Sequence, residues 1–199
     1  TLEKAPRVLE ALATVEKLWV TYGAFIDIST RSVEDAHQSL PQISELNLPV
    51  LHQMNKTVGE FERHYSGTGT IHPVLALAIN VAGRQRMLSQ KASKEFCLII
   101  AGQDVAANRA ALAQTIALFD TSLQALRNGD DDMGMPAAPT EKIQTQLQIV
   151  ADLWNPLRAV LEATATGAAP TKAQINQIAH DNNPLLKEMN AAVTMYSQL

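Results

Sequence analysis

The sequence predicts an all-α protein, and three observations support this fold class. The 199-residue chain has only 5% aromatic residues and 9 glycines, and Ala and Leu are frequent. Apolar residues recur at helical intervals, as at Leu147, Val150, Leu153, Leu157 and Leu161. An internal repeat also relates two blocks that each have the pattern of a helical pair. Together these favour packed helices over a sheet-based fold.

The repeat appears when the sequence is shifted by 135 positions (154 − 19) without a gap. Trp19 then falls on Trp154, and Met54-Asn55 falls on Met189-Asn190. Other identical pairs are Val15 and Val150, Leu18 and Leu153, Gln42-Ile43 and Gln177-Ile178, Asn47 and Asn182, and Pro49 and Pro184. We therefore expect residues 70–199 to form a complete four-helix module. Residues 1–65 would be the C-terminal helical half of a first module, whose beginning is missing or lies upstream.

Six helices are expected in order along the chain. Their approximate ranges are 3–28, 33–65, 73–101, 104–127, 140–165 and 171–199. Pro73 suits the first turn of the third helix, and Gly102 is expected just after its end. Thr171 can cap the sixth helix. Pro49 and Pro184 lie inside helical patterns, where each is expected to cause a kink. The simplest arrangement of the last four helices is an antiparallel bundle.

Composition and motifs exclude several functions. The net charge of −4 and the lack of a dominant basic face argue against nucleic-acid binding. No apolar run of about 18 residues is present, so we expect no membrane contact within this segment. There is no His pair at i and i+4 and no phosphate-binding or nucleophile motif. The sequence therefore predicts no enzyme activity, no metal site and no cofactor.

Several single residues carry structural expectations. Cys97 lies between Phe96 and Leu98, and we expect it to be a small buried core residue. Repeated Trp at equivalent helix positions is more often core packing than a ligand box, and the Met-Asn pairs predict packing plus a local polar contact. The run Asp130-Asp131-Asp132 lacks the alternating pattern of a calcium loop, so a solvated loop is expected.

One stretch departs from the average charge. No Asp or Glu occurs from Arg63 through Lys94, although this window contains five Lys and Arg residues. On a helix, Arg86 falls in the middle of a mostly apolar stripe formed by Leu75, Ile79, Ala82, Ser93, Cys97 and Ile100. Arg84 points about 160° away from it. A guanidinium among apolar residues is costly without an anion or carboxylate, and its planar fork suits a small oxyanion.

A structural alternative accompanies this hypothesis. Arg86 would pair with Asp or Glu on another helix, or extend its side chain to the edge of the bundle. Spacing alone favours this alternative. The lack of Asp and Glu from Arg63 through Lys94 makes it less favoured but does not exclude it.

The segment Ile79-Asn-Val-Ala-Gly83-Arg-Gln-Arg86-Met-Leu-Ser89-Gln-Lys91 resembles the opening motif of PilJ/NarX-like sensor domains. The segments Leu118-Phe119-Asp120 and Val150 to Trp154 also fit the layout of that family. The resemblance covers residues 70–199 as one module and residues 1–65 as the second half of a preceding one. It implies a periplasmic or other extracytoplasmic four-helix module that dimerises and senses a small ligand.

The resemblance also implies roles for particular residues. In nitrate-sensing members, the Arg before the motif's Met reaches the anion at the dimer interface, and that position is Arg86 here. The candidate ligand contacts are Arg86, Gly83, Arg84, Ser89 and Asn80. Nitrate or nitrite is the candidate ligand, with a homodimer through the Arg86 helix. Arg84-Gln85 departs from the small and apolar residues of the nitrate kinases.

The expected function is therefore that of a sensor module of a chemoreceptor, a sensor kinase or a periplasmic protein. The alternative is a helical interaction module that binds a protein partner, such as a pilus component, without any small-molecule ligand.

Overall fold

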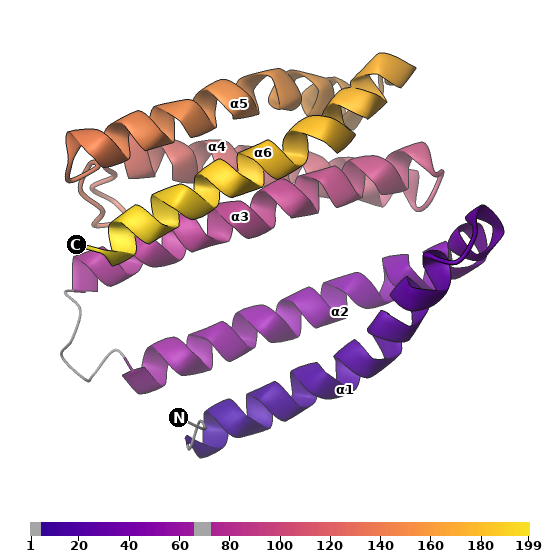
Figure 1. The fold of residues 1–199 in the computed structure, drawn as a ribbon, viewed down its shortest axis with the longest axis horizontal. Helices are drawn as coiled ribbons and strands as arrows, with labels where there is room; N and C mark the ends of the chain where they lie inside the picture. Colours follow the sequence, from indigo (N-terminus) through magenta and orange to yellow (C-terminus); the bar gives the residue numbers. More distant parts are fainter. Residues whose placement is uncertain (1–4, 66–72) are drawn as a thin grey trace. The chain divides into compact units, whose positions relative to one another are not determined.

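The structure is a computed structural model that describes residues 5–65 and 73–199, and helices make up nearly all of it. The helices are α1 (Pro6–Ser29), α2 (Val33–Tyr65), α3 (Pro73–Ile100), α4 (Val105–Asn128), α5 (Glu141–Ala165) and α6 (Lys172–Ser197) (Figure 1). The described residues form no strand, and one isolated bridge joins Asp130 to Met135. The all-α prediction is confirmed, and every expected helix lies within a few residues of an observed one.

The chain divides into two compact units between residues 70 and 71. We call the part that contains α1 and α2 unit 1, and the part that contains α3 to α6 unit 2. In unit 2, α3 contacts α4 and α6, and α5 contacts the same two helices. Each helix thus has two main neighbours, and the four close into a bundle around one core. Within the described ranges, no helix has the length and apolar character that crossing a bilayer requires.

Local signals in the sequence set the helix ends of unit 2. Gly129 ends α4 at a φ of 83°, and a Cβ there would lie 2.8 Å from the backbone nitrogen of Ala137. Glycine is therefore required at this turn. The Thr140 hydroxyl accepts a hydrogen bond from the Ile143 amide at the start of α5. Thr171 caps α6 in a capping box with Gln174, as predicted.

Trp154 lies at the centre of the unit 2 core. Its side chain is 2% exposed and stacks on Phe119, with ring centroids 4.0 Å apart. Its indole Nε1 donates a hydrogen bond of 2.7 Å to Asp120 Oδ1, so the one polar atom of the ring is satisfied. The core assignment of Trp154 is confirmed.

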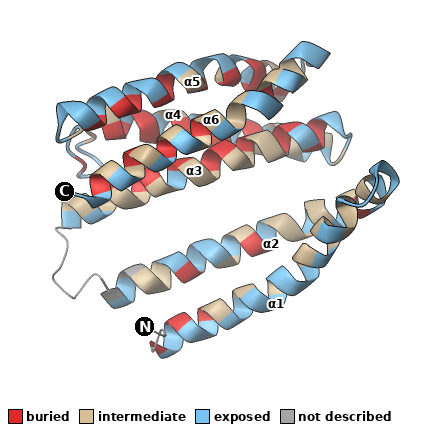
Figure 2. Cartoon of the chain, viewed as in Figure 1, coloured by how far each residue is buried: buried red, intermediate tan, exposed pale blue. Residues whose placement is uncertain are grey.

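Unit 1 has a much smaller buried interior than unit 2 (Figure 2). Trp19 is 56% exposed and Met54 is 41% exposed, so the core assignment is wrong for these two members of the repeat. Their partners in unit 2, Trp154 and Met189, are 2% and 0% exposed. The physical reason is that α1 and α2 form only a pair in unit 1, whereas the equivalent helices α5 and α6 are covered by α3 and α4.

Two further expectations concern α3 and the prolines. Cys97 is exposed, so the prediction of a buried thiol is wrong. Its immediate neighbours Phe96 and Leu98 are buried, and the chain turns Cys97 away from the core between them. Pro49 and Pro184 lie inside helices that continue through them, as does Pro156 in α5. Asp131 and Asp132 are exposed in the loop after α4, in agreement with the expected solvated loop.

The two tryptophans provide a test of the difference in burial between unit 1 and unit 2. We expect Trp154→Ala to lower the free energy of unfolding of unit 2 by about 3–5 kcal/mol, because it opens a cavity beside Phe119. Trp19→Ala should cost less than about 1 kcal/mol, because most of its ring is already in water. Urea denaturation followed by far-UV circular dichroism measures both. Equal losses would contradict the assignment of Trp154 to a closed core and Trp19 to an open face.

Candidate functional site

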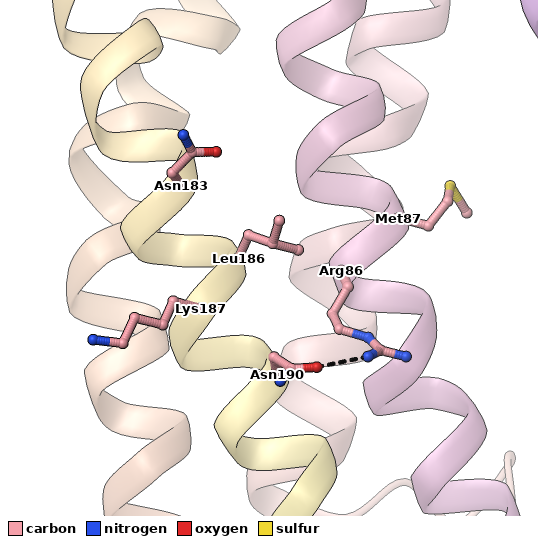
Figure 3. A pocket seen from close by; sticks show the side chains of 6 residues that line it. All are labelled: Arg86, Met87, Asn183, Leu186, Lys187 and Asn190. Atoms are coloured by element: carbon pink, nitrogen blue, oxygen red, sulfur yellow. Dashed lines mark hydrogen bonds between the residues drawn. The ribbon is translucent and has the colours of Figure 1, made fainter. Parts of the chain in front are cut away.

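The candidate site is a pocket between α3 and α6, which are neighbouring helices of unit 2 (Figure 3). It is an open depression of about 680 Å³. We call it the α3–α6 pocket, and its lining residues are Arg86, Met87, Asn183, Leu186, Lys187 and Asn190. Two of these side chains are cationic and none is acidic, so the lining has a net positive charge.

The Arg86 side chain is half-buried at the edge of the bundle, where its guanidinium points toward α6 (Figure 3). Its Nη1 donates a hydrogen bond of 2.7 Å to Oδ1 of Asn190. Within residues 5–65 and 73–199, Arg86 makes no ion pair with a carboxylate. The prediction that Arg86 pairs with Asp or Glu on another helix is therefore wrong. Its position at the edge of the bundle agrees with the other structural alternative, in which the side chain extends to that edge. A full positive charge faces the pocket with only a neutral partner.

The stripe of α3 that faces the core differs from the expected one. The predicted stripe placed Arg86 among core residues, but of its members only Ala82 is buried, while Ile100 is 41% exposed. The buried stripe is rotated relative to it and consists mainly of Ala78, Ala82, Gln85, Leu88, Ala92, Phe96 and Ile99. Arg86 thus lies beside the core face and not within it. Leu75 and Ile79 pack against the core from its edge and remain half-buried.

A polar cluster occupies the core side of α3. Glu95 is fully buried and forms an ion pair with Lys91, whose side chain is 21% exposed. The hydroxyl of Thr115 on α4 accepts a hydrogen bond from Lys91 Nζ (2.6 Å) and lies 2.8 Å from Glu95 Oε2. Gln85 Nε2 donates to the Phe119 carbonyl at 2.9 Å. These contacts join α3 to α4, and they satisfy the buried charge that would otherwise be costly.

This cluster changes the interpretation of the acid-free window. Lys91 is neutralised by Glu95, which follows the window directly, and Arg63 pairs with Glu60 at 2.6 Å within unit 1. The window is therefore not a continuous positive surface. Of the charges in this window, the guanidinium of Arg86 is the one that faces the α3–α6 pocket. Lys187 also lines the pocket, but its side chain points away from Arg86 (Figure 3).

The other four predicted site residues differ in how close they lie to Arg86 and the α3–α6 pocket. Gly83 is close to Arg86, because a Cβ built on Gly83 would lie 3.7 Å from Arg86 Nη2. Ser89 is buried, and its hydroxyl donates to the Arg86 carbonyl at 2.9 Å. Arg84 is exposed and Asn80 is half-buried. Of the five, only Arg86 lines the α3–α6 pocket.

Sequence reasoning did not assign the α6 side of the pocket. The internal repeat draws attention to the pair Met189-Asn190, but it predicts only a polar contact between Asn190 and residues near it in the sequence. Its amide instead reaches Arg86, which is 104 positions earlier in the chain. Lys187 and Asn183 had no signal that distinguished them from ordinary solvent-facing helix positions.

A second depression of about 670 Å³ lies between α4 and α5 and gives a useful contrast. It also contains an arginine, Arg158, but Arg158 Nε lies 2.9 Å from Asp120 Oδ2 and 2.9 Å from Glu162 Oε1. Its charge is already compensated by two carboxylates. Of these two depressions, only the α3–α6 pocket presents an uncompensated arginine.

Unit 2 is thus a four-helix bundle with a cationic pocket beside its first helix. In agreement with this class, residues 75–191 match the model of the PilJ family, described as the type IV pili methyl-accepting chemotaxis transducer N-terminal domain. The match covers more than half of the chain. The chain therefore belongs to the PilJ family.

A sequence relative and a solved structure extend this finding. The methyl-accepting chemotaxis protein McpN of Pseudomonas aeruginosa is 34% identical over 119 residues, which are 60% of this chain and 22% of McpN. The chain thus spans about a fifth of the length of that relative. The solved ligand-binding domain of the P. aeruginosa nitrate receptor McpN is 33% identical with a TM-score of 0.54. That match covers 65% of this chain and 98% of the McpN domain, so homology supports a chemoreceptor sensor module.

The two sides of α3 should respond differently to mutation. We expect Glu95→Ala to lower the free energy of unfolding by about 3 kcal/mol, because Lys91 then loses its carboxylate in the interior. Arg86→Ala should cost less than about 1 kcal/mol, because it removes an exposed hydrogen bond to a neutral amide. Urea denaturation of the two variants measures this difference. A comparable loss in Arg86→Ala would show that this arginine holds the fold.

Proposed function

We propose that unit 2 is an extracytoplasmic sensor module that binds a small oxyanion, nitrate or nitrite, through Arg86. The observation that carries this proposal is the guanidinium of Arg86, which borders an open pocket without a carboxylate partner among the described residues. A small planar anion would supply the missing negative charge through charge-assisted hydrogen bonds. The relation to a domain described as that of a nitrate receptor supports this ligand class.

The proposal gives different roles to the other four predicted site residues, which are Gly83, Arg84, Ser89 and Asn80. Gly83 leaves the space beside Arg86 Nη2 open, so a ligand can approach that nitrogen closely. Ser89 supports the backbone of Arg86 from the buried side through its hydrogen bond to the Arg86 carbonyl. Arg84 and Asn80 lie on the same helix and would contact the ligand only if a second copy of the module brought it to them.

The proposal includes a homodimer through α3. The stripe formed by Leu75, Ile79, Ser93, Cys97 and Ile100 runs along the same side of α3 as Arg86 and is half-buried or exposed in one copy. A second copy packed on this stripe would bring two Arg86 side chains toward one another, and their repulsion would be relieved by a shared monoanion. Anion binding would then favour one packing of the helix pair over another.

Residues 1–65 are proposed to be the C-terminal half of a first PilJ-like module. The gap-free repeat supports this assignment, as does the contrast between exposed Trp19 and its buried equivalent Trp154. The exposed face of α1 and α2 would then be covered by a helix pair equivalent to α3 and α4. The same exposed face is the observation that favours the alternative function, a protein-interaction module.

Anion binding tests the main proposal directly. Calorimetric titration of the wild-type chain with nitrate and with nitrite should show saturable binding, and Arg86→Gln should weaken it about 10- to 100-fold by removing charged hydrogen bonds. Lys142→Gln is the control, since it removes the same charge from an exposed position on α5, which does not line the α3–α6 pocket. Its effect should stay below about twofold. Absence of binding and of any thermal shift in the wild type would favour the interaction module.

Cys97 provides a native probe of the dimer, because it is the single cysteine of the chain and is exposed on the Arg86 side of α3. If two α3 helices pack in parallel about a two-fold axis, the two Cys97 side chains face each other. Mild oxidation should then give a disulfide-linked dimer, and nitrate should change the yield. Non-reducing electrophoresis measures this, with Cys97→Ser as control. Failure to cross-link, together with a monomeric mass at saturating nitrate, would contradict an α3 dimer.

A further inference from the structure

Arg86 uses only part of its donor set in the contact with α6. Nη1 donates to Asn190 Oδ1, whereas Nη2 has no hydrogen-bond partner in the described part of the chain. Nη2 lies on the side of Gly83, where the missing side chain leaves it accessible. The guanidinium is thus fixed at one nitrogen and open at another.

Asn190 is suited to this arrangement because its side-chain amide carries one acceptor and one donor group. The acceptor, Oδ1, is occupied by Arg86. The donor, Nδ2, makes no hydrogen bond with the described residues, and Asn190 is exposed in the lining of the same pocket. The Arg86–Asn190 pair therefore presents several unused N–H groups from two helices, and the second lone pair of Oδ1 is the one acceptor left on these head groups.

The neutral character of Asn190 is as important as its geometry. A carboxylate at this position would form an ion pair with Arg86 and occupy the charge that an anion needs. An amide can hold the same nitrogen at the same distance without cancelling the charge. The fold thereby obtains a fixed guanidinium that still attracts an anion.

We propose that Asn190 is a positioning and specificity residue of the anion site, which it forms together with Arg86. It holds Nη1, leaves Nη2 and its own Nδ2 as donors, and so selects small anions that only accept hydrogen bonds. This inference rests on the proposed function of the α3–α6 pocket and deepens it. An anion with a hydroxyl group would present a proton to a site in which N–H donors outnumber acceptors, and it would offer these donors fewer lone pairs than an anion of the same shape without a proton.

The internal repeat supplies a matched control for this residue. Asn55 occupies the equivalent place in unit 1, follows a Met as Asn190 does, and is also exposed. The substitutions Asn190→Asp and Asn55→Asp therefore add the same negative charge to the same chain at equivalent helix positions. Only the first places a carboxylate on Arg86.

The first experiment measures nitrate affinity by calorimetry in the full chain at pH 7. Asn190→Asp should weaken nitrate binding by at least about tenfold, because the introduced carboxylate competes for the guanidinium. Asn55→Asp should change it less than about twofold. Circular dichroism and urea denaturation of both variants show whether the helical fold is kept, so that a loss of affinity can be distinguished from a loss of structure.

The second experiment tests selection between anions of one shape. Hydrogencarbonate is planar and singly charged, like nitrate, but carries a hydroxyl group. The wild type should bind nitrate more tightly, and Asn190→Ala should reduce this preference by about three- to tenfold through loss of the Nδ2 donor and of the hold on Nη1. Circular dichroism of each variant confirms the helical fold.

The outcomes separate the two proposals. If the wild type binds nitrate but Asn190→Asp and Asn190→Ala bind with unchanged affinity and selectivity, the role of Asn190 is overturned and the anion site stands. If the wild type binds neither nitrate nor nitrite, the proposed function fails and the role of Asn190 fails with it. Loss of affinity confined to the Asn190 variants, with an unchanged helical fold, supports both.

Discussion

The rotational setting of α3 is the constraint on which the rest of unit 2 depends, and the contacts of Lys91 and Glu95 with Thr115 of α4 help to fix it. Glu95 is almost completely shielded from solvent, and it meets Lys91 and Thr115 at the α3–α4 contact. Because Lys91 and Glu95 lie on the same helix, rotation of α3 would keep their ion pair but would separate both side chains from Thr115 of α4. It would also break the hydrogen bond from Gln85 to the Phe119 carbonyl and leave buried polar groups without partners. Since Arg86 lies nine positions before Glu95, about 180° around the helix, the same cluster directs Arg86 away from the core. The position of Arg86 thus follows from buried contacts on the other side of its helix.

The packing of unit 2 explains why an arginine can remain unpaired there. The α3–α6 contact is made at the edge of the bundle, where the Arg86 stem packs against the protein and its head group still reaches water. A guanidinium in the core would require a carboxylate, as Lys91 requires Glu95. At the edge, a single amide from Asn190 is sufficient. Burial thus determines that Lys91 is neutralised by a carboxylate, whereas Arg86 is held by a neutral amide.

Helical periodicity predicted the six helices because long apolar patterns, caps and breaks such as Thr171 and Gly129 act locally. It did not fix the rotation of α3, because apolar residues occur around much of that helix, from Leu75 to Ile100, and several stripes fit the same period. The exposure of Trp19 was missed for a different reason. Equivalence to Trp154 in the repeat says nothing about which helices are present to cover it.

Of the candidate site, the sequence predicted Arg86 but not its partner on α6. Arg86 was distinguished by its own charge among apolar neighbours, a local property that the sequence displays. Its partner on α6 was not, because the contact joins residues 104 positions apart and no periodicity relates the two helices. The acid-free window also overstated the positive surface, since it ended one residue before the carboxylate that neutralises Lys91. Charge counted along a chain does not measure charge exposed on a folded surface.

The position of the α3–α6 pocket also affects how this module can change over generations. Its polar lining residues, from Arg86 to Asn183, Lys187 and Asn190, are exposed or half-buried, whereas the groups that hold the bundle together lie on other faces. Substitutions at exposed positions usually alter stability only slightly. The side chains of this pocket can therefore be exchanged without compensating changes in the interior. The chemistry of the pocket and the stability of the bundle are in this way set by separate residues.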